Sequence, residues 1–336
     1  LIGSNAGDAL TTGNYNVALG YQALSAEDAH GRNVAIGYEA LKDLNAGADS
    51  YNTAIGFRAG ENVSTGLRNT ILGGLACDAI TTGGYNTAIG MQALSTETGG
   101  SYNVAVGTGA LELLNTNSAA YNTAVGYTAG QLMTTGTNNS LIGGTAGAAL
   151  TDGANNVAIG RAALNSAQSD SNCIAIGYAA LGTLNGSGTS YNVAVGHSAG
   201  NAVTTGVRNV LIGGTAGDSL TSGSYNVALG FGALQTEDAH GKNIAIGHTA
   251  LYAQDAGADA YNIAVGYQAG FAVTTGVRNV LIGGFAGDNL ATGSENVAVG
   301  LQALSSEDTH SYNVAIGRSA LEAQNAGADA YNVAVG

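Results

Sequence analysis

The pattern N-V-A-I-G at residues 33–37 decides the fold, because it recurs along the whole chain. Asn is followed by a small or β-branched residue, by Ala or a larger aliphatic residue, by Ile, Val or Leu, and by Gly. The motif glycine lies at positions 3, 20, 37, 56, 73, 90, 107, 126, 143, 160, 177, 196, 213, 230, 247, 266, 283, 300, 317 and 336. A fixed short period is typical of a solenoid, in which each repeat contacts chiefly its neighbours.

Two repeat lengths are nested. Successive motif glycines are separated by 17, 17, 19 and 17 residues, which sum to 70, and the series continues to the end of the chain. Leu72, Ile142, Ile212 and Ile282 share one position of this 70-residue repeat. We therefore predict an all-β fold, a parallel β-solenoid of about 20 coils, that forms one continuous array over residues 1–336. Because both chain ends fall inside the motif, we expect a segment of a longer chain or a subunit of an end-to-end stack.

The composition fits a repeat array and excludes some functions. Gly accounts for 54 of 336 residues, Pro and Trp are absent, and 10% of residues are charged. The net charge of −14, with nine Lys and Arg, leaves no basic stripe for nucleic acid. No run of about 18 apolar residues occurs, so we expect no membrane insertion of this segment. Cys77 and Cys173 occupy different repeat positions about six coils apart, so we expect two buried substitutions and no disulfide.

Each coil is predicted to contain two short strands and two turns: the motif strand, a second apolar element x-x-A-L or x-x-A-G, and a polar turn. In the motif strand the second and fourth positions are apolar or Thr or Ser, and the third is Ala or a periodic Leu or Ile. A strand with one face in water should show polar residues at alternate positions. We therefore expect one face to pack inside the coil and the other against something else. Small residues at the third position, such as Ala18 and Ala35, would permit close approach of another chain.

An invariant alanine indicates a thin coil. Every coil carries Ala three residues after the motif glycine, from Ala6 to Ala320. So thin a coil holds about three or four inward apolar groups, and at about 25 cal/mol per Å² these barely offset the ordering entropy of about 1–2 kcal/mol per residue. We therefore expect the chain to gain further stability by associating with copies of itself.

The motif asparagine is predicted to form a structural ladder along the coils. An Asn at a turn can bond its side-chain amide to the backbone of the next coil. A ligand-binding row of Asn is the less favoured alternative. The ladder residues are Asn16, Asn33, Asn52, Asn69, Asn86, Asn103, Asn122, Asn139, Asn156, Asn192, Asn209, Asn226, Asn243, Asn262, Asn279, Asn296, Asn313 and Asn332.

The runs SYNVAVG, AYNTAVG, SNCIAIG and GANNVAIG, each followed by G-x-x-A, resemble two groups of known repeats. They resemble the N-S-V-A-I-G repeats of YadA-like heads in trimeric autotransporter adhesins, and more closely the Asn- and Gly-rich repeats of phage tail fibres and related surface proteins. The resemblance implies a left-handed β-roll, a homotrimer and an extracellular, cell-surface or virion location. The adhesin-head coil is shorter, and its Asn aligns with the residue before the motif Asn here, which is Asn only at Asn138, Asn155 and Asn172.

An E-D-x-H turn is the most chemistry-like feature. It occurs at residues 27–30, 237–240 and 307–310, which end in His30, His240 and His310. A carboxylate beside His could bind a cation or act as a base. The turn is lost in the other two blocks, where Gly100 and Asp170 replace the His, so the sequence favours a solvated turn. We predict no catalytic residue, no cofactor and no metal site.

Two further repeat positions carry residue types that can form sites. Asp8, Asp78, Asp218 and Asp288 share one position, but Ala148 replaces them once, which argues against an obligatory metal site. Paired Thr residues recur in turns and raise the question of ice binding, which needs regular Thr rows on a flat face. The pairs occur only in some coils, at residues 11–12, 81–82, 134–135, 204–205 and 274–275, so ice binding is not favoured.

Every fourth coil has two extra residues, and such insertions often form a binding face. We call the tyrosines that end these longer turns the ledge tyrosines. Together with neighbouring Asn they are the candidate contacts for a receptor or a neighbouring fibre. The ledge tyrosines are Tyr51, Tyr121, Tyr191, Tyr261 and Tyr331.

These observations predict a non-enzymatic structural fibre or adhesin shaft that associates with copies of itself, as a trimer and possibly end to end. The alternative is a glycan- or receptor-binding module that uses the longer turns against a glycan or a cell-surface receptor. A polysaccharide-degrading solenoid enzyme should show a non-repeating acidic cluster, and the sequence contains none.

Overall fold

The computed structural model describes residues 1–186, 188–325, 329 and 331–336. These residues contain no helix and form nineteen strands of three residues each, in two compact units, Leu1–Ser171 and Asn172–Gly336. The first unit contains β1 (Val17–Leu19), β2 (Val34–Ile36), β3 (Thr53–Ile55), β4 (Thr70–Leu72), β5 (Thr87–Ile89), β6 (Val104–Val106), β7 (Thr123–Val125), β8 (Ser140–Ile142) and β9 (Val157–Ile159). The second contains β10 (Ile174–Ile176), β11 (Val193–Val195), β12 (Val210–Ile212), β13 (Val227–Leu229), β14 (Ile244–Ile246), β15 (Ile263–Val265), β16 (Val280–Ile282), β17 (Val297–Val299), β18 (Val314–Ile316) and β19 (Val333–Val335).

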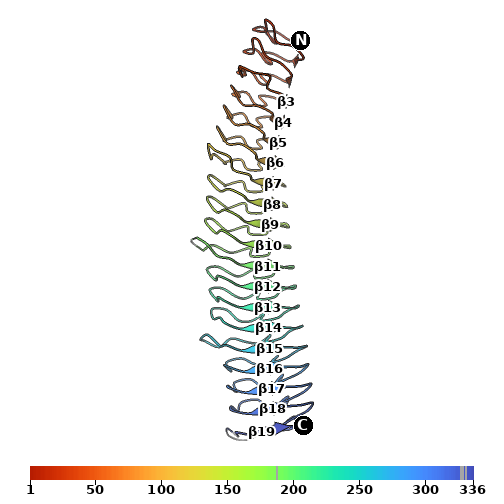
Figure 1. Ribbon diagram of the computed structural model, residues 1–336, viewed down its shortest axis with the longest axis vertical. Coiled ribbons are helices and arrows are strands. Elements are labelled where there is room, and N and C mark those ends of the chain that lie inside the picture. The colour runs from red at the N-terminus through yellow and green to blue at the C-terminus, as the bar shows by residue number, and fades with distance from the viewer. Residues whose placement is uncertain (187, 326–328, 330) are drawn as a thin grey trace. The chain divides into compact units, whose positions relative to one another are not determined.

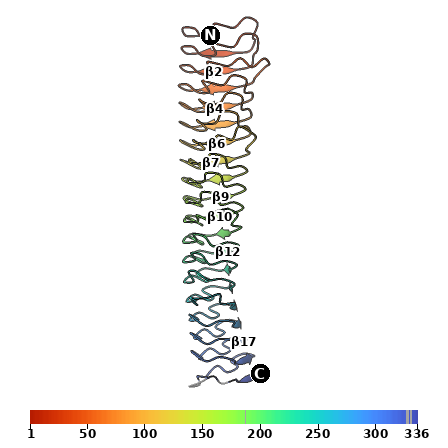
Figure 2. The ribbon, with the colours of Figure 1, turned by 90° about the vertical axis from the view of Figure 1, so that its left-hand side faces the viewer.

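Within each unit, every strand pairs in parallel with the strand of the next coil, at the same motif position. Val17 lies beside Val34 and Ala18 beside Ala35 in the first unit, and the second unit repeats this register. Figures 1 and 2 show the strands of each unit lying one above the next. The predicted parallel β-solenoid is therefore confirmed. The interpretation of residues 1–336 as one continuous array stays a prediction.

The motif glycine is required by both conformation and space. Gly56 has φ +145°, a region that side chains rarely adopt, and a Cβ added to it would lie 2.6 Å from the carbonyl oxygen of Gly73 in the next coil. Close stacking of successive coils at this corner therefore leaves room only for glycine.

Only one strand forms per coil, so the prediction of two is wrong. In the second apolar element, residues two and four after the motif glycine take left-handed conformations, as Glu39 (φ 55°) and Leu41 (φ 47°) do. Such alternation turns the chain and prevents an extended strand. Bonds between coils continue there: the Leu41 amide donates to the Ala59 carbonyl at 3.1 Å.

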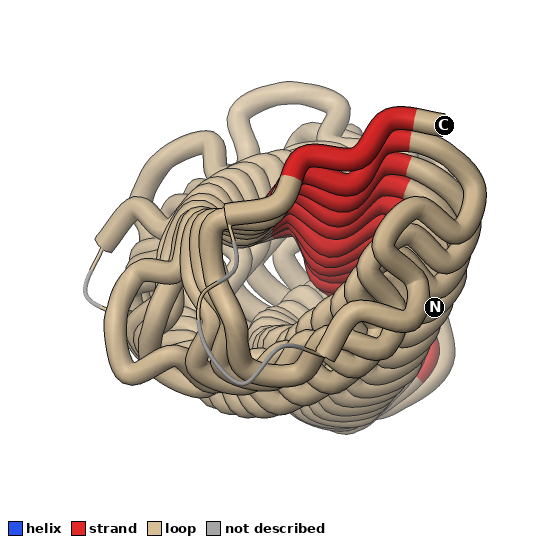
Figure 3. The backbone as a smooth tube through the Cα atoms, turned by 90° about the horizontal axis from the view of Figure 1, so that it is seen from below, coloured by secondary structure: helices blue, strands red, loops and turns tan. Residues whose placement is uncertain are grey.

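The third position of the motif, which is the middle residue of each strand, points into the coil. From β1 to β18 it is at most 1% exposed, and Ala40 and Leu41 of the second apolar element are buried as well. The prediction that small residues at this position permit close approach of another chain is wrong, because Ala35 and its equivalents from β1 to β18 are buried within their own chain. The second and fourth positions point outward, and Figure 3 shows the strands on one side of the coils.

The motif asparagines lie inside the turn that precedes each strand. The sixteen from Asn33 to Asn313 are buried, whereas Asn16 is half-buried and Asn332 exposed. The amide of Asn69 donates to Asn52 Oδ1 at 2.8 Å, and Asn52 Nδ2 donates to the Gly66 carbonyl at 2.8 Å. The buried asparagine side chains thus link successive coils.

Both cysteines are fully buried, and burial raises the pKa of the Cys77 thiol. The described part of the chain contains no helix that is long and apolar enough to cross a membrane.

Candidate functional site

The E-D-x-H turns bury their glutamates. Glu27, Glu237 and Glu307 are 0% exposed, in the turns that follow β1, β13 and β17. The interpretation of these turns as solvated is therefore wrong for the glutamate, although Asp28 and Asp238 are exposed. A carboxylate without solvent needs partners inside the protein.

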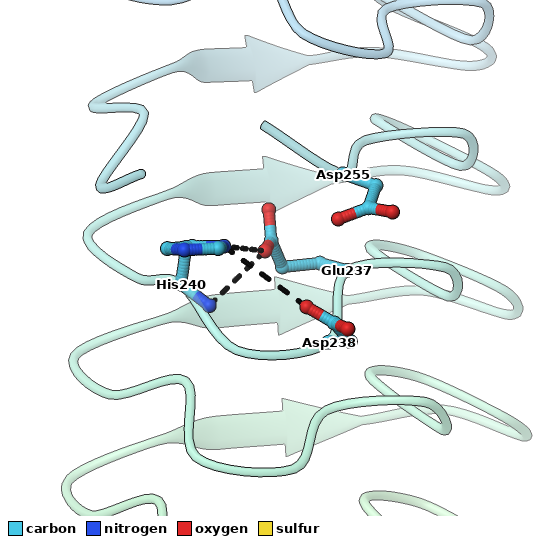
Figure 4. Close-up of side chains that lie close together, drawn as sticks. All are labelled: Glu237, Asp238, His240 and Asp255. Atoms are coloured by element: carbon cyan, nitrogen blue, oxygen red, sulfur yellow. Dashed lines mark hydrogen bonds and ion pairs between the residues drawn. The ribbon is translucent and has the colours of Figure 1, made fainter. Parts of the chain in front are cut away.

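Glu237 belongs to the largest group of possible metal-ligating side chains in the described part of the chain. Its Oε1 accepts the His240 backbone amide at 3.2 Å and lies 3.4 Å from His240 Nδ1, which in turn lies 4.0 Å from Asp238 Oδ1. Asp255 approaches from the next coil, in the turn after β14, and one ligand atom from each of the four residues lies within 4.8 Å of the others. Figure 4 shows the Glu237 carboxylate between the His240 ring and Asp255.

Two atoms of this cluster have no hydrogen-bond partner. They are Glu237 Oε2 and His240 Nδ1, both shielded from solvent. Although Nδ1 is within ion-pair distance of Oε1, no hydrogen bond joins them. Burial raises the pKa of Glu237 to about 7, and the neighbouring carboxylates of Asp255 and Asp238 add to this, while the His240 amide and ring oppose it.

The other two turns have the same arrangement with smaller clusters. His30 Nδ1 lies 3.6 Å from Glu27 Oε1 and has no hydrogen bond, whereas His310 Nδ1 is hydrogen-bonded to Glu307 Oε1 at 2.5 Å. The second carboxylate oxygen of both glutamates lacks a partner.

Sequence reasoning missed a fourth buried glutamate. Glu97 occupies the same position of the 70-residue repeat, in a turn without His, and is also 0% exposed. Ala167 takes this position in the third block. The spacing of Glu27, Glu97 and Glu237 by multiples of the 70-residue repeat is the sequence signal that identifies the set.

The ledge tyrosines are exposed, whereas the ladder asparagines that follow the first four of them are buried. Tyr51 is 48% exposed, and the guanidinium groups of Arg32 and Arg68 lie 5.3 and 6.0 Å from the centre of its ring. Asn52 is fully buried in the ladder, whereas Asn45 and Asn117, within the longer turns, are exposed, and contact of the ledges with a partner stays a prediction. The Tyr51 ring faces are covered by cations of the protein itself.

The first threonine of each pair donates its hydroxyl hydrogen bond within the protein. Thr81 Oγ1 donates to the Thr98 carbonyl of the next coil at 3.1 Å, and Thr204 Oγ1 donates to the Thr221 carbonyl at 3.2 Å. These hydroxyls reinforce the stacking of coils, which favours a structural role for the Thr pairs.

No protein-family model matches the sequence, and no curated protein is significantly similar to it. Function therefore has to be inferred from the geometry of this chain.

Proposed function

We propose that this chain is a non-enzymatic structural repeat protein, a fibre or adhesin shaft that associates with copies of itself through the outward face of its strands. The supporting observation is the chemistry of that face. The second and fourth positions of the motif are the first and last residues of each strand, and they face outward. Across the nineteen described strands they carry only Val, Ile, Leu, Thr or Ser, and the fourth position is always aliphatic.

The outward strand face is unusual for a surface in water. Its fourth-position side chains include Leu72, Ile142 and Leu229, which are 44%, 41% and 42% exposed. Parallel sheets normally have both faces covered, and large contiguous apolar patches mark interaction sites. An uncovered face of this kind requires a partner.

A second copy of the chain is the partner that fits best. Rungs of a parallel sheet repeat every 4.7–4.9 Å, and a copy presents aliphatic side chains at the same spacing. With no charge on the outward strand face, nothing there selects a charged partner. The resemblance in sequence implies three copies and an extracellular or virion-surface location, and both belong to this proposal.

The absence of catalysis is part of the proposal. Acid–base chemistry needs a carboxylate within reach of substrate, and Glu27, Glu237 and Glu307 are fully buried.

Recognition of glycans by the ledge tyrosines is less well supported. Stacking on a sugar needs a free ring face, and Arg32 and Arg68 cover those of Tyr51. Binding of the intact chain to a glycan array, lost in Tyr51→Ala and Tyr261→Ala, would favour this alternative.

The test places charge on the outward strand face. The double variant Leu72→Lys, Ile142→Lys should lower the native mass measured by sedimentation, because a buried lysine in an apolar interface is costly. The matched control is Leu132→Lys, at a side chain that is 45% exposed but lies in a turn outside the strands. Circular dichroism checks that both variants fold.

The control variant should keep the mass of the unaltered chain. If the double variant also keeps that mass while remaining folded, association does not use the strand face and the proposal is wrong.

A further inference from the structure

We infer that the cluster of Glu237, Asp238, His240 and Asp255 binds a divalent transition-metal ion, with Zn²⁺ as the ion that fits best. Four side chains of metal-binding type, from two successive coils, bring one ligand atom each within 4.8 Å of one another (Figure 4).

The first argument is the state of the buried carboxylate. Glu237 is 0% exposed, and its Oε2 has no hydrogen-bond partner. A buried acceptor left without a partner is costly, and a native protein normally supplies one. A cation seated between Glu237 and His240 would supply it, and would also occupy the unpartnered Nδ1 of His240.

The second argument is distance. Zinc takes nitrogen and oxygen ligands at about 2.0–2.2 Å in tetrahedral geometry, which places neighbouring ligand atoms about 3.4 Å apart. Glu237 Oε1 and His240 Nδ1 are 3.4 Å apart, and Nδ1 lies 4.0 Å from Asp238 Oδ1. Since Asp238 and Asp255 are exposed, rotation of their side chains can bring their oxygens to the same centre.

The ligand types select the class of ion. An imidazole nitrogen combined with carboxylates suits zinc and its neighbours in the transition series. Calcium prefers six to eight oxygen ligands, and magnesium keeps most of its water. We therefore expect both alkaline-earth ions to bind much more weakly.

The cluster at Glu237 is better equipped than its two counterparts. Asp255 stands where the equivalent residues of the other blocks are Asn45, Asn115, Asn185 and Asn325, so this block alone gains a third carboxylate as its fourth ligand. At the counterpart in the last block, His310 Nδ1 already bonds to Glu307. The sequence pattern favoured no metal site because it did not reveal that the glutamate is buried.

A bound ion would join two coils. Glu237 and His240 belong to the turn after β13, while Asp255 belongs to the longer turn after β14. The ion would hold that longer turn against the preceding coil and stabilise the folded state in proportion to its occupancy. The inference does not depend on the proposed function, because the site lies in a turn and not on the outward strand face.

The test is calorimetric titration of the full, metal-stripped chain with Zn²⁺, and separately with Ca²⁺ and Mg²⁺. Asp255→Asn, which restores the residue of the other blocks and so should fold, is expected to weaken zinc binding at least tenfold. Glu237→Ala, which copies Ala167 of the third block, should abolish binding at this site. His248→Ala is the matched control for adventitious binding by an exposed-turn histidine and should change nothing.

Hydrogen exchange of the turn after β14 gives a second readout. Zinc should slow exchange over residues 253–259 in the unaltered chain and not in Glu237→Ala. Three outcomes would overturn the inference: no zinc binding at micromolar concentration, equal zinc binding by Glu237→Ala, or equal affinity for calcium.

Discussion

The turns at Glu97 and Glu237 place the same residue at the same repeat position, equally buried, in opposite hydrogen-bonding states. Glu97 accepts six hydrogen bonds, whereas Glu237 accepts one and leaves Oε2 without a partner. The donors to Glu97 are the amides of Thr98, Gly99, Gly100, Thr116 and Asn117 and the Thr116 hydroxyl, at 2.7–3.4 Å.

The contrast shows that position in the repeat does not determine what a buried carboxylate contributes. A carboxylate that accepts several amide bonds stabilises the fold, while one without partners carries the cost of desolvation. Several side chains differ between the turns: among the donors to Glu97, Gly99 and Gly100 are replaced by bulkier residues, and Thr116 is replaced by Ala256. The repeat thus keeps its backbone conformation, while changes of side chain alter how many hydrogen bonds the buried carboxylate accepts.

The largest expected effect is at Glu97. In Glu97→Ala, five backbone amides lose their acceptor in a shielded turn, and the local stability should fall by about 3 kcal/mol. Hydrogen exchange of residues 98–100 and 116–117 should then accelerate about a hundredfold.

Glu237→Ala in metal-free protein is the matched comparison. Because it removes an unpartnered oxygen together with one hydrogen bond, it should change local stability by less than about 1 kcal/mol. Equal acceleration of exchange in both variants would contradict the assigned difference between the two turns.

A threonine hydroxyl introduced beside Glu237 should give this carboxylate a donor like the one that Thr116 supplies to Glu97. Ala256 lies nineteen residues after Glu237, as Thr116 does after Glu97. Ala256→Thr is expected to give Glu237 Oε2 a donor and to raise stability by about 1 kcal/mol, measured as a higher denaturant midpoint. A lower midpoint would show that the turn after β14 cannot adopt the conformation of its counterpart.

The smallest expected effect is at Asp218, one of the half-buried aspartates that share a position of the 70-residue repeat. Burial raises the pKa of Asp218 above its ordinary value of 3.8, and its Oδ1 has no partner. The folded chain therefore binds the proton of Asp218 more tightly than the unfolded chain does. Above the folded pKa, the buried ionised carboxylate lowers the free energy of unfolding. Below pH 3.8 the carboxyl group is protonated in both states, and this destabilisation is absent.

Asp218→Ala, which copies Ala148, should raise stability at pH 8 by about 0.5 kcal/mol after allowance for solvent screening. The gain should vanish at pH 3.5, as denaturant midpoints at the two pH values would reveal. A loss of stability at pH 8 would mean that this carboxylate has partners in solution.

The sequence predicted the fold because each coil repeats the same constraints. Strict spacing of Gly56 and its equivalents, the invariant Ala and the buried Asn row all follow from stacking identical coils in register. The predicted number of strands per coil is wrong, because left-handed residues such as Leu41 are not glycines and their conformation is not visible in the sequence. The predicted orientation of the third motif position is also wrong. Both faces of the strand are apolar, so the sequence pattern does not distinguish the inward face from the outward face.

The candidate site was only partly predictable. His240 and its acidic neighbours stand out in the sequence, but burial of Glu237 depends on how the turn folds over it, and the approach of Asp255 depends on the next coil. Solvation and partners of a carboxylate are properties of tertiary packing that residue types alone do not specify.

The central claim is that the outward strand face is an interface between copies of this chain. The most direct measurement is the native mass of the unaltered chain by sedimentation equilibrium at micromolar concentration. The account predicts a species whose mass is a multiple of 33.0 kDa, with three copies expected from the resemblance. A stable, folded particle of 33.0 kDa across the concentration range would contradict it.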